Sequence, residues 1–208
     1  RAGLRRGMKL AKSPDEVGVL SRTMDKARKK DGRALLAQAL IVAGAHQPMI
    51  AGPAFAKLLE DKDPGLRLLA LRGIEATRHE SVLPMIIELL DHEDYLIRGD
   101  AVRALSTFEN VPQEHGQKIE SLSRDENAAV RLSATMALKV LPEEQCLNAL
   151  SHRLEDEAWA VRDVAVETLN GMRSIPATRI LANHMKRAKG LVRDETYQYL
   201  KNLTGQDF

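Results

Sequence analysis

Six histidines and one cysteine are the residues of this chain whose side chains are best suited to bind a metal ion or to attack a substrate. Two histidines precede a glutamate, in His79-Glu80 and His92-Glu93. A zinc-binding helix built on this dipeptide needs a second histidine four residues after the first, and neither pair has one. The sequence therefore predicts no metal site, and we expect both histidines in solvated turns between helices.

Cys146 is the second candidate for chemistry, and as a single cysteine it has no partner for an intramolecular disulfide. His152 follows it after six residues, which places the two side chains on different faces of a helix. We therefore expect Cys146 to be a small buried residue. The glycine-rich phosphate loops and the nucleophile elbow are also absent. These observations predict a protein without enzymatic activity and without a bound cofactor.

The composition indicates which elements must position the remaining side chains. Hydrophobic residues make up 44% of the chain and charged residues 29%, which is typical of a globular protein, whereas aromatic residues make up only 3%. Abundant Ala and Leu with few aromatic residues favour closely packed helices. No run of about 18 apolar residues occurs, so no membrane span is expected. The composition does not indicate a cellular compartment.

Charge is distributed unevenly along the chain. Residues 1–30 contain ten Lys or Arg and three Asp or Glu, whereas residues 80–167 contain eight basic and eighteen acidic residues. Proteins that bind nucleic acid along their length usually carry a basic stripe throughout. Binding to nucleic acid is therefore disfavoured for the middle of the chain and stays an alternative only for the basic N-terminal segment.

An arginine that follows an apolar residue recurs in helix-like surroundings at spacings of 31, 33, 31 and 31 residues. Apolar or small residues stand one position before, and three and seven positions after, nearly every one of these arginines, so they share one stripe of a helix. A period of this length indicates an array of stacked helix pairs. The recurring arginines are Arg67, Arg98, Arg131, Arg162 and Arg193.

A proline and an acidic turn mark the other half of each unit. The prolines lie 14 to 20 residues before the arginines, where they suit the first turn of a helix. The turns before the arginine helices are mostly acidic, which caps an incoming helix and complements its dipole. The prolines expected to begin the first helices are Pro53, Pro84, Pro112, Pro142 and Pro176.

This pattern resembles the HEAT repeat in the short form found in phycobilisome-lyase-type proteins, over about residues 53–204. The motif is clearest in "LLEDKDPGLRLLALRGI" and "LLDHEDYLIRGDAVRAL". The resemblance implies an all-α fold, a right-handed α-α superhelix of about six helix pairs. We expect one solenoid domain over 1–208, with a basic segment at 1–14, a degenerate first repeat at 15–46 and five repeats over 48–208. Since the first residue is Arg1 and not Met, we expect a fragment of a larger protein.

The resemblance also implies a structural role for the recurring arginines. In HEAT-like families this arginine reaches an acidic turn residue of its own repeat or of the adjacent one, and the contacts form a ladder along the stack. The last repeat departs from this pattern, because Lys186, Arg187 and Lys189 stand where acidic residues are expected. The acidic partners expected for the arginine ladder are Asp63, Asp94, Asp125 and Asp156.

The second helices of such an array line a concave surface, where related proteins bind ligands. The position five residues after each arginine is expected to face outward there, together with Asp163. Tyr95 and Trp159 lie in the turns, where each is either an interface anchor or a local plug over its own turn. The residues expected on the concave surface are Arg72, Arg103, Met136, Asp163, Glu167 and Gln198.

These observations predict a monomeric, non-enzymatic scaffold that binds a protein or peptide through its concave face. The acidic middle of the chain favours a partner with a basic surface. Two alternatives stay open: an accessory factor of lyase type that binds a bilin or a similar cofactor, and a protein that binds nucleic acid through its basic N-terminal segment.

Overall fold

Eleven α-helices and two short 3₁₀ helices form the described part of the chain, which contains no strand. The structure is a computed structural model, and it describes residues 13–108, 111–187, 193–194, 197–198, 201 and 205. The all-α prediction is confirmed. The chain divides into two compact units, residues 1–108 and 109–208. The prediction of one continuous solenoid domain over 1–208 stays a prediction.

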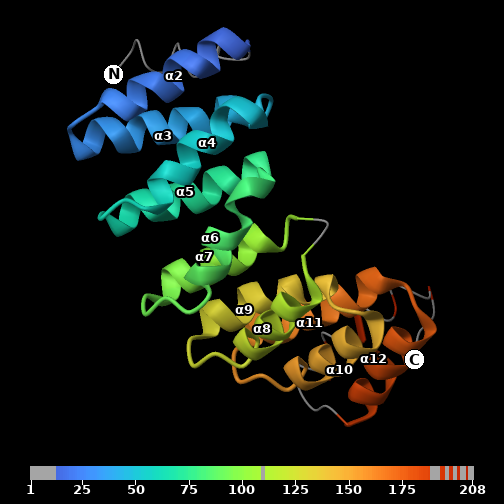
Figure 1. The fold of residues 1–208 in the computed structure, drawn as a ribbon. Coiled ribbons are helices and arrows are strands. Elements are labelled where there is room, and N and C mark those ends of the chain that lie inside the picture. Colours follow the sequence, from blue (N-terminus) through green and yellow to red (C-terminus); the bar gives the residue numbers. More distant parts are fainter. Residues whose placement is uncertain are drawn as a thin grey trace. The chain divides into compact units, whose positions relative to one another are not determined.

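Unit 1 consists of three helix pairs (Figure 1). The second helix of each pair packs on the second helix of the next, so that α5 contacts both α3 and α7. Within the pairs, α2 packs on α3, α4 on α5 and α6 on α7. The helices of unit 1 are α2 (Pro14–Lys26), α3 (Lys30–Gly44), α4 (Pro48–Leu59), α5 (Pro64–Thr77), η1 (Glu80–Val82), α6 (Leu83–Leu89) and α7 (Tyr95–Leu105).

Unit 2 repeats this arrangement with two helix pairs and one further helix. Its second helices α9 and α11 pack on each other, and α8, α10 and α12 pack on one or both of them. The helices of unit 2 are α8 (Gln113–Leu122), α9 (Ala128–Ala137), η2 (Leu138–Val140), α10 (Glu143–Arg153), α11 (Trp159–Met172) and α12 (Ile175–Arg187).

The apolar stripe around each arginine forms the core of both units. Small residues three positions after the arginines allow the helices to approach closely, and the larger residues on either side fill the space between helices. None of the stripe residues in α5, α7, α9 with η2, and α11 is more than 2% exposed. These residues are Leu66, Ala70, Ile74, Ile97, Ala101, Leu105, Val130, Ala134, Leu138, Val161, Ala165 and Leu169.

Four of the five prolines begin a helix or immediately precede one, as the sequence predicts. Pro84 and Pro176 are the second residues of α6 and α12, and Pro112 and Pro142 are N-caps of α8 and α10. The prediction for Pro53 is wrong, because this residue lies inside α4, which begins at Pro48. Pro53 has no N–H to donate within the helix. The buried turns of α4 on either side of Pro53 pack against α5, and this packing stabilises the helix.

Candidate protein-binding surface

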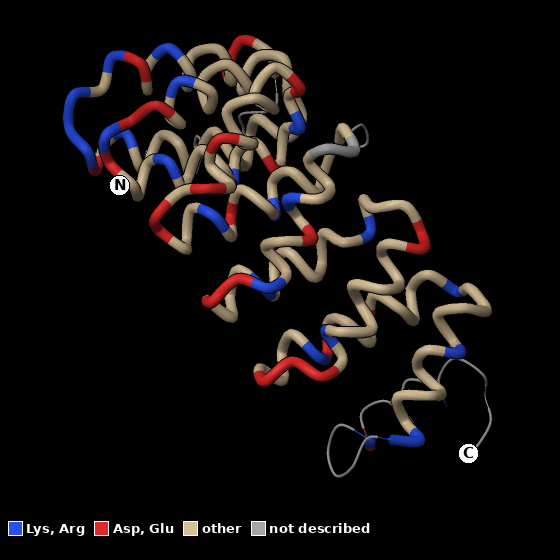
Figure 2. The backbone as a smooth tube through the Cα atoms, turned by 60° about the horizontal axis from the view of Figure 1, so that its bottom comes forward, with Lys and Arg blue, Asp and Glu red and all other residues tan. Residues whose placement is uncertain are grey.

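Four of the five recurring arginines fold back onto the turn that precedes their own helix. In each of the four, Nη1 donates to the backbone carbonyl of the residue six positions earlier, so the guanidinium ties the turn to the helix. Figure 2 shows charged residues gathered at these turns. The Nη1 to carbonyl oxygen distances are 3.3 Å for Arg67 to Asp61, 2.8 Å for Arg98 to His92, 3.0 Å for Arg131 to Asp125 and 2.8 Å for Arg162 to Asp156.

The side chain at this sixth position caps the turn. It accepts the backbone N–H two residues later, as when Asp156 Oδ1 accepts from Ala158 at 3.0 Å and Asp125 Oδ1 from Asn127 at 2.8 Å. Asp63 and Asp94 lie at another position, where they are the N-caps of α5 and α7. The four acidic residues expected as one set therefore occupy two different positions of the turn.

Arg131 and Asp156 form the strongest contact of the arginine ladder. Arg131 Nε and Nη2 each donate to an Asp156 carboxylate oxygen at 3.0 Å, and the side chains are only 6% and 4% exposed. Arg131 Nη2 also donates to Glu157 Oε1 at 2.9 Å. Burial favours a raised pKa for Asp156, but the hydrogen bond from Arg131, the N–H of Ala158 and the nearby arginine charges lower the pKa overall.

Unit 1 contains two further contacts at positions that correspond to Arg131 and Asp156, and neither was predicted as part of the arginine ladder. Arg33 of α3 forms an ion pair with Asp61, so Arg33 occupies the arginine position of the degenerate first repeat. Arg67 Nη2 lies 3.4 Å from Nε2 of His92, which occupies the position of Asp156. The constant spacing of six residues before each arginine is the signal that identifies both Asp61 and His92.

Among the described residues, Arg162 has no carboxylate contact like that of Arg131, and its buried Nε, like that of Arg67, has no hydrogen-bond partner. Arg162 makes the two contacts to its own turn, to the carbonyls of Asp156 at 2.8 Å and Glu157 at 3.1 Å. Arg193 is helical and exposed.

The expected concave-surface residues of unit 1 are held by neighbouring charges. Arg103 donates to Glu75 at 3.0 Å and to Asp100 at 2.7 Å, and Arg72 lies 3.7 Å from the same Asp100. These four side chains come from α5 and α7 and form one network of ion pairs. Two basic side chains of this surface are therefore already compensated by two acidic ones.

The expected surface residues of unit 2 are differently placed. Met136 on α9 is 48% exposed and Glu167 on α11 is exposed, with no ion pair to Glu167 among the described residues. Asp163 is half-buried, one turn before Glu167. The packed helices α9 and α11 thus carry one exposed thioether and one exposed carboxylate, and no ion pair to this carboxylate occurs within the part of the chain that the structure describes. Gln198 is helical and exposed, in a part of the chain of which only single residues or pairs are described.

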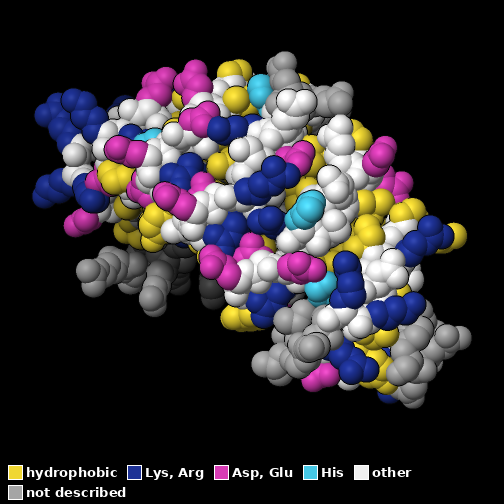
Figure 3. All heavy atoms as spheres, turned by 90° about the horizontal axis from the view of Figure 1, so that it is seen from below, with side chains coloured by type: hydrophobic (Ala, Val, Ile, Leu, Met, Phe, Trp, Pro, Cys, Tyr) yellow, Lys and Arg dark blue, Asp and Glu magenta, His cyan; other side chains and the backbone are white. Residues whose placement is uncertain are grey.

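The two turn aromatics are both exposed. Trp159 is 64% exposed and Tyr95 is 43% exposed, so neither ring is buried over its own turn. Their role as interface anchors stays a prediction. On the face of the molecule drawn in Figure 3, acidic and basic side chains are interspersed with hydrophobic ones.

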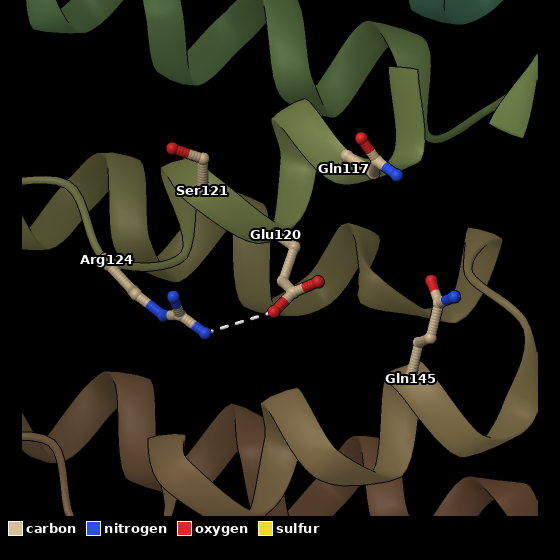
Figure 4. A pocket seen from close by; sticks show the side chains of 5 residues that line it. All are labelled: Gln117, Glu120, Ser121, Arg124 and Gln145. Atoms are coloured by element: carbon tan, nitrogen blue, oxygen red, sulfur yellow. Dashed lines mark hydrogen bonds and ion pairs between the residues drawn. The ribbon is translucent and has the colours of Figure 1, made fainter. Parts of the chain in front are cut away.

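A hollow of about 660 Å³ lies between α8 and α10 in unit 2 (Figure 4). Its lining is entirely polar or charged, and Glu120 and Arg124 form an ion pair of 3.0 Å within it. Small-molecule sites are usually lined mainly by hydrophobic and aromatic side chains. The hollow therefore has the character of an open polar groove. Its other lining residues are Gln117, Ser121 and Gln145.

Cys146 is buried within α10, as expected, and burial together with Glu143 raises the pKa of its thiol to about 11. The thiol is therefore protonated at neutral pH and poorly nucleophilic. Within residues 13–108 and 111–187, no three His, Cys, Asp or Glu side chains gather in a way that fits a metal ion. Across the described helices, none is long and apolar enough to cross a membrane.

The basic N-terminal segment is only partly described. Residues 1–12 lie outside the described residues. Beyond them, Lys30 pairs with Asp63 at 2.6 Å, and Asp25 pairs with Lys57 at 2.7 Å. Part of the charge of this segment is thus compensated within unit 1.

Comparison with known proteins identifies the class. The family model for HEAT repeats matches residues 52–114 and 117–201, which is more than half of the chain, and the chain belongs to this family. It is 26% identical over 135 residues to the uncharacterized phycocyanin operon protein Z of Pseudanabaena tenuis, covering 61% of this chain and 67% of that protein.

Two solved structures show the same fold. The complex of CpcE and CpcF of phycocyanin lyase from Nostoc contains a chain with a TM-score of 0.60 and 16% identity, covering 96% of this chain and 88% of that one. A designed armadillo repeat protein in complex with peptide (KR)4 has a TM-score of 0.54 and 18% identity, covering 96% of this chain and 98% of that one. The protein is a HEAT-repeat protein with sequence similarity to a phycocyanin operon protein.

Proposed function

We propose that this protein is a non-enzymatic scaffold that binds a basic segment of a partner protein on the inner surface of unit 2, formed by Met136, Asp163 and Glu167. The observation that carries the proposal is the exposed Glu167, uncompensated among the described residues, together with the exposed Met136 of the packed neighbour α9. In unit 1 the equivalent arginines already have carboxylate partners.

The chemistry of this surface suits a lysine or arginine side chain. A carboxylate on a rigid helix attracts a cation and steers its approach, and a thioether adapts to an aliphatic stem. The designed armadillo protein of the same fold was solved with a peptide of alternating Lys and Arg, and the CpcE and CpcF chains were solved as a complex. Both neighbours support an array that acts by binding another chain.

The test uses the peptide (KR)4 and isothermal titration calorimetry at low and moderate salt. Replacing Asp163 and Glu167 together by Lys reverses the charge of the inner surface, so we expect at least about tenfold weaker binding and a shallower salt dependence. Replacing Glu143 and Glu144 by Lys makes the same charge change at the exposed start of α10. We expect this control to bind almost as the parent protein does. Equal weakening by both pairs would show that only net charge matters and would refute the inner surface as the site.

Similarity to a phycocyanin operon protein and to a phycocyanin lyase chain favours a second candidate function, an accessory factor that holds a bilin. Mixing the protein with a linear tetrapyrrole and recording the visible spectrum distinguishes this second candidate from the scaffold. A saturable spectral shift supports the second candidate, and an unchanged spectrum favours the scaffold.

A further inference from the structure

Arg162 repeats the position of Arg131 but lacks its carboxylate. Both arginines donate through Nη1 to the two carbonyls of the preceding turn, at 3.0 and 3.1 Å for Arg131 and at 2.8 and 3.1 Å for Arg162. Nε and Nη2 of Arg131 then bind Asp156, whereas the buried Nε of Arg162 has no partner. The guanidinium of Arg162 is thus held in the same place as that of Arg131, but its Nε–H has no acceptor.

The sequence explains why the acceptor is missing. Asp156 lies 25 residues after Arg131, and the residue 25 positions after Arg162 is Arg187. Residues 188–192 contain no Asp or Glu. The end of α12 instead presents Lys186 and Arg187, both exposed. The residue 25 positions after Arg162 is therefore basic, whereas the residue 25 positions after Arg131 is the acidic Asp156.

His184 is the second group at this end without a partner. It lies on α12, one turn before Arg187, is 4% exposed, and its Nε2 has no hydrogen-bond partner. Burial lowers the pKa of His184, and the charges of Arg187 and Arg162 lower it further, against the opposing charge of Glu155. His184 and Arg187 lie one turn apart on α12, and α12 packs on α11, the helix that carries Arg162. Buried polar groups without a hydrogen-bond partner are unfavourable, so an incoming acceptor recovers part of this free energy.

We propose that Arg162, His184 and Arg187 form a binding site for a carboxylate group of an acidic peptide segment in a partner protein. The carboxylate takes the place that Asp156 takes beside Arg131. A planar carboxylate matches the Nε and Nη2 fork of arginine, and three neighbouring donors compensate its charge. The site on α11 and α12 uses other side chains than Met136, Asp163 and Glu167, and it does not depend on the proposed function.

The experiment uses the whole chain, labelled with ¹⁵N, and follows the Arg162 Nε–H and His184 imidazole signals by NMR. The probe is the blocked peptide Glu-Asp-Glu-Ala, which copies residues 155–158, with Gln-Asn-Gln-Ala as the neutral control. Inorganic phosphate is the third probe. We expect saturable shifts of both signals with the acidic peptide, none with the neutral peptide and weaker shifts with phosphate. Bound carboxylate favours the imidazolium, so the pKa of His184 should rise.

A matched pair of variants decides the assignment. Arg187→Asp supplies a carboxylate at the position of Asp156, so we expect binding of the acidic peptide to fall by about tenfold or more. Arg179→Asp makes the same charge change at an exposed site of the same helix and should leave binding nearly unchanged. Equal losses in both variants, binding of phosphate alone, or no shift of either signal by the acidic peptide would overturn the proposal.

Discussion

Two contacts of the arginine ladder with the same spacing of 25 residues, one in each unit, take different forms, although unit 1 also contains the carboxylate contact of Arg33 with Asp61. In unit 2, Arg131 meets Asp156 through two hydrogen bonds of 3.0 Å. In unit 1, Arg67 meets His92, whose Nδ1 already accepts the N–H of Asp94 at 3.0 Å. A neutral imidazole with an acceptor at Nδ1 carries its hydrogen at Nε2, so two donors face each other across the 3.4 Å to Arg67. The repeat places the residues, and the side-chain chemistry at one position decides how strongly they interact.

The expected concave surfaces of the two units also differ, but here it is unit 1 that has the ion pairs. In unit 1 the charged side chains form a network of ion pairs between Arg72, Glu75, Asp100 and Arg103. In unit 2, Glu167 is exposed and has no ion pair among the described residues. Unit 2 thus uses carboxylates to hold its turns together and presents another to solvent. This contrast is the basis for assigning partner binding to unit 2.

The largest expected effect is the loss of the buried carboxylate in unit 2. Asp156→Ala leaves the buried guanidinium of Arg131 with only the exposed carboxylate of Glu157, so we expect a loss of about 3 kcal/mol in the free energy of unfolding. His92→Ala, at the same position in unit 1, should cost less than about 1 kcal/mol. Urea denaturation measures both, with fluorescence of Trp159 reporting on unit 2 and far-ultraviolet circular dichroism on the whole chain. Similar small losses would remove the contrast between the two contacts.

The small residues of the core stripe should behave alike in both units. Ala101 and Ala134 are fully buried, so Ala101→Leu and Ala134→Leu should each overpack a helix contact and cost about 1–3 kcal/mol. Met136→Leu changes an exposed side chain of α9 and should stay within about 0.5 kcal/mol. Thermal melting compares the three variants. A neutral result in only one unit would show that the two stripes are not equivalent.

The histidine contact in unit 1 can be converted into a carboxylate contact. In His92→Asp the carboxylate accepts from both Arg67 and the N–H of Asp94, so we expect stabilisation by about 1 kcal/mol. His46→Asp makes the same change at an exposed residue of unit 1 and should alter stability by less than about 0.5 kcal/mol. Differential scanning calorimetry at pH 7 measures both. A lower melting temperature for His92→Asp would contradict the equivalence of His92 and Asp156.

The ion-pair network on the inner surface of unit 1 should contribute modestly. Arg103→Ala removes contacts to Glu75 and Asp100 in a partly exposed setting, so we expect a loss of up to about 1 kcal/mol. Glu167→Ala in unit 2 should have an effect within about 0.3 kcal/mol, since no ion pair is lost among the described residues. Denaturant titration at low and high salt separates the two, because only the loss at Arg103 should shrink with salt.

The smallest effect expected is a pH dependence from His184. Its folded-state pKa is lowered by burial, so the unfolded chain binds more protons below its ordinary pKa of about 6.5. Stability should therefore fall as pH drops below about 6.5, and His184→Gln should flatten this part of the profile. Melting temperatures from pH 8 to pH 5 test the sign. A rise in stability toward pH 5 that His184→Gln abolishes would contradict it.

The sequence was sufficient to predict the repeat and the buried stripe, whereas the contact of the arginines with acidic turn residues was implied by the family resemblance. These features depend on a spacing that recurs in every unit, so several copies support each position. Asp61 and His92 were missed as ladder residues because they were sought by residue type and not by position. The network of Arg72 with Asp100, and the exposure of Trp159, depend on contacts between repeats or on local side-chain placement that the spacing does not specify.

Mapping the peptide (KR)4 onto the backbone amide signals of the ¹⁵N-labelled chain tests whether unit 2 binds basic segments. The account predicts that the largest saturable shifts lie on α9 and α11 around Met136, Asp163 and Glu167, with small shifts on α5 and α7. Largest shifts around Arg72 and Arg103, or at the turn that carries Trp159, would contradict it.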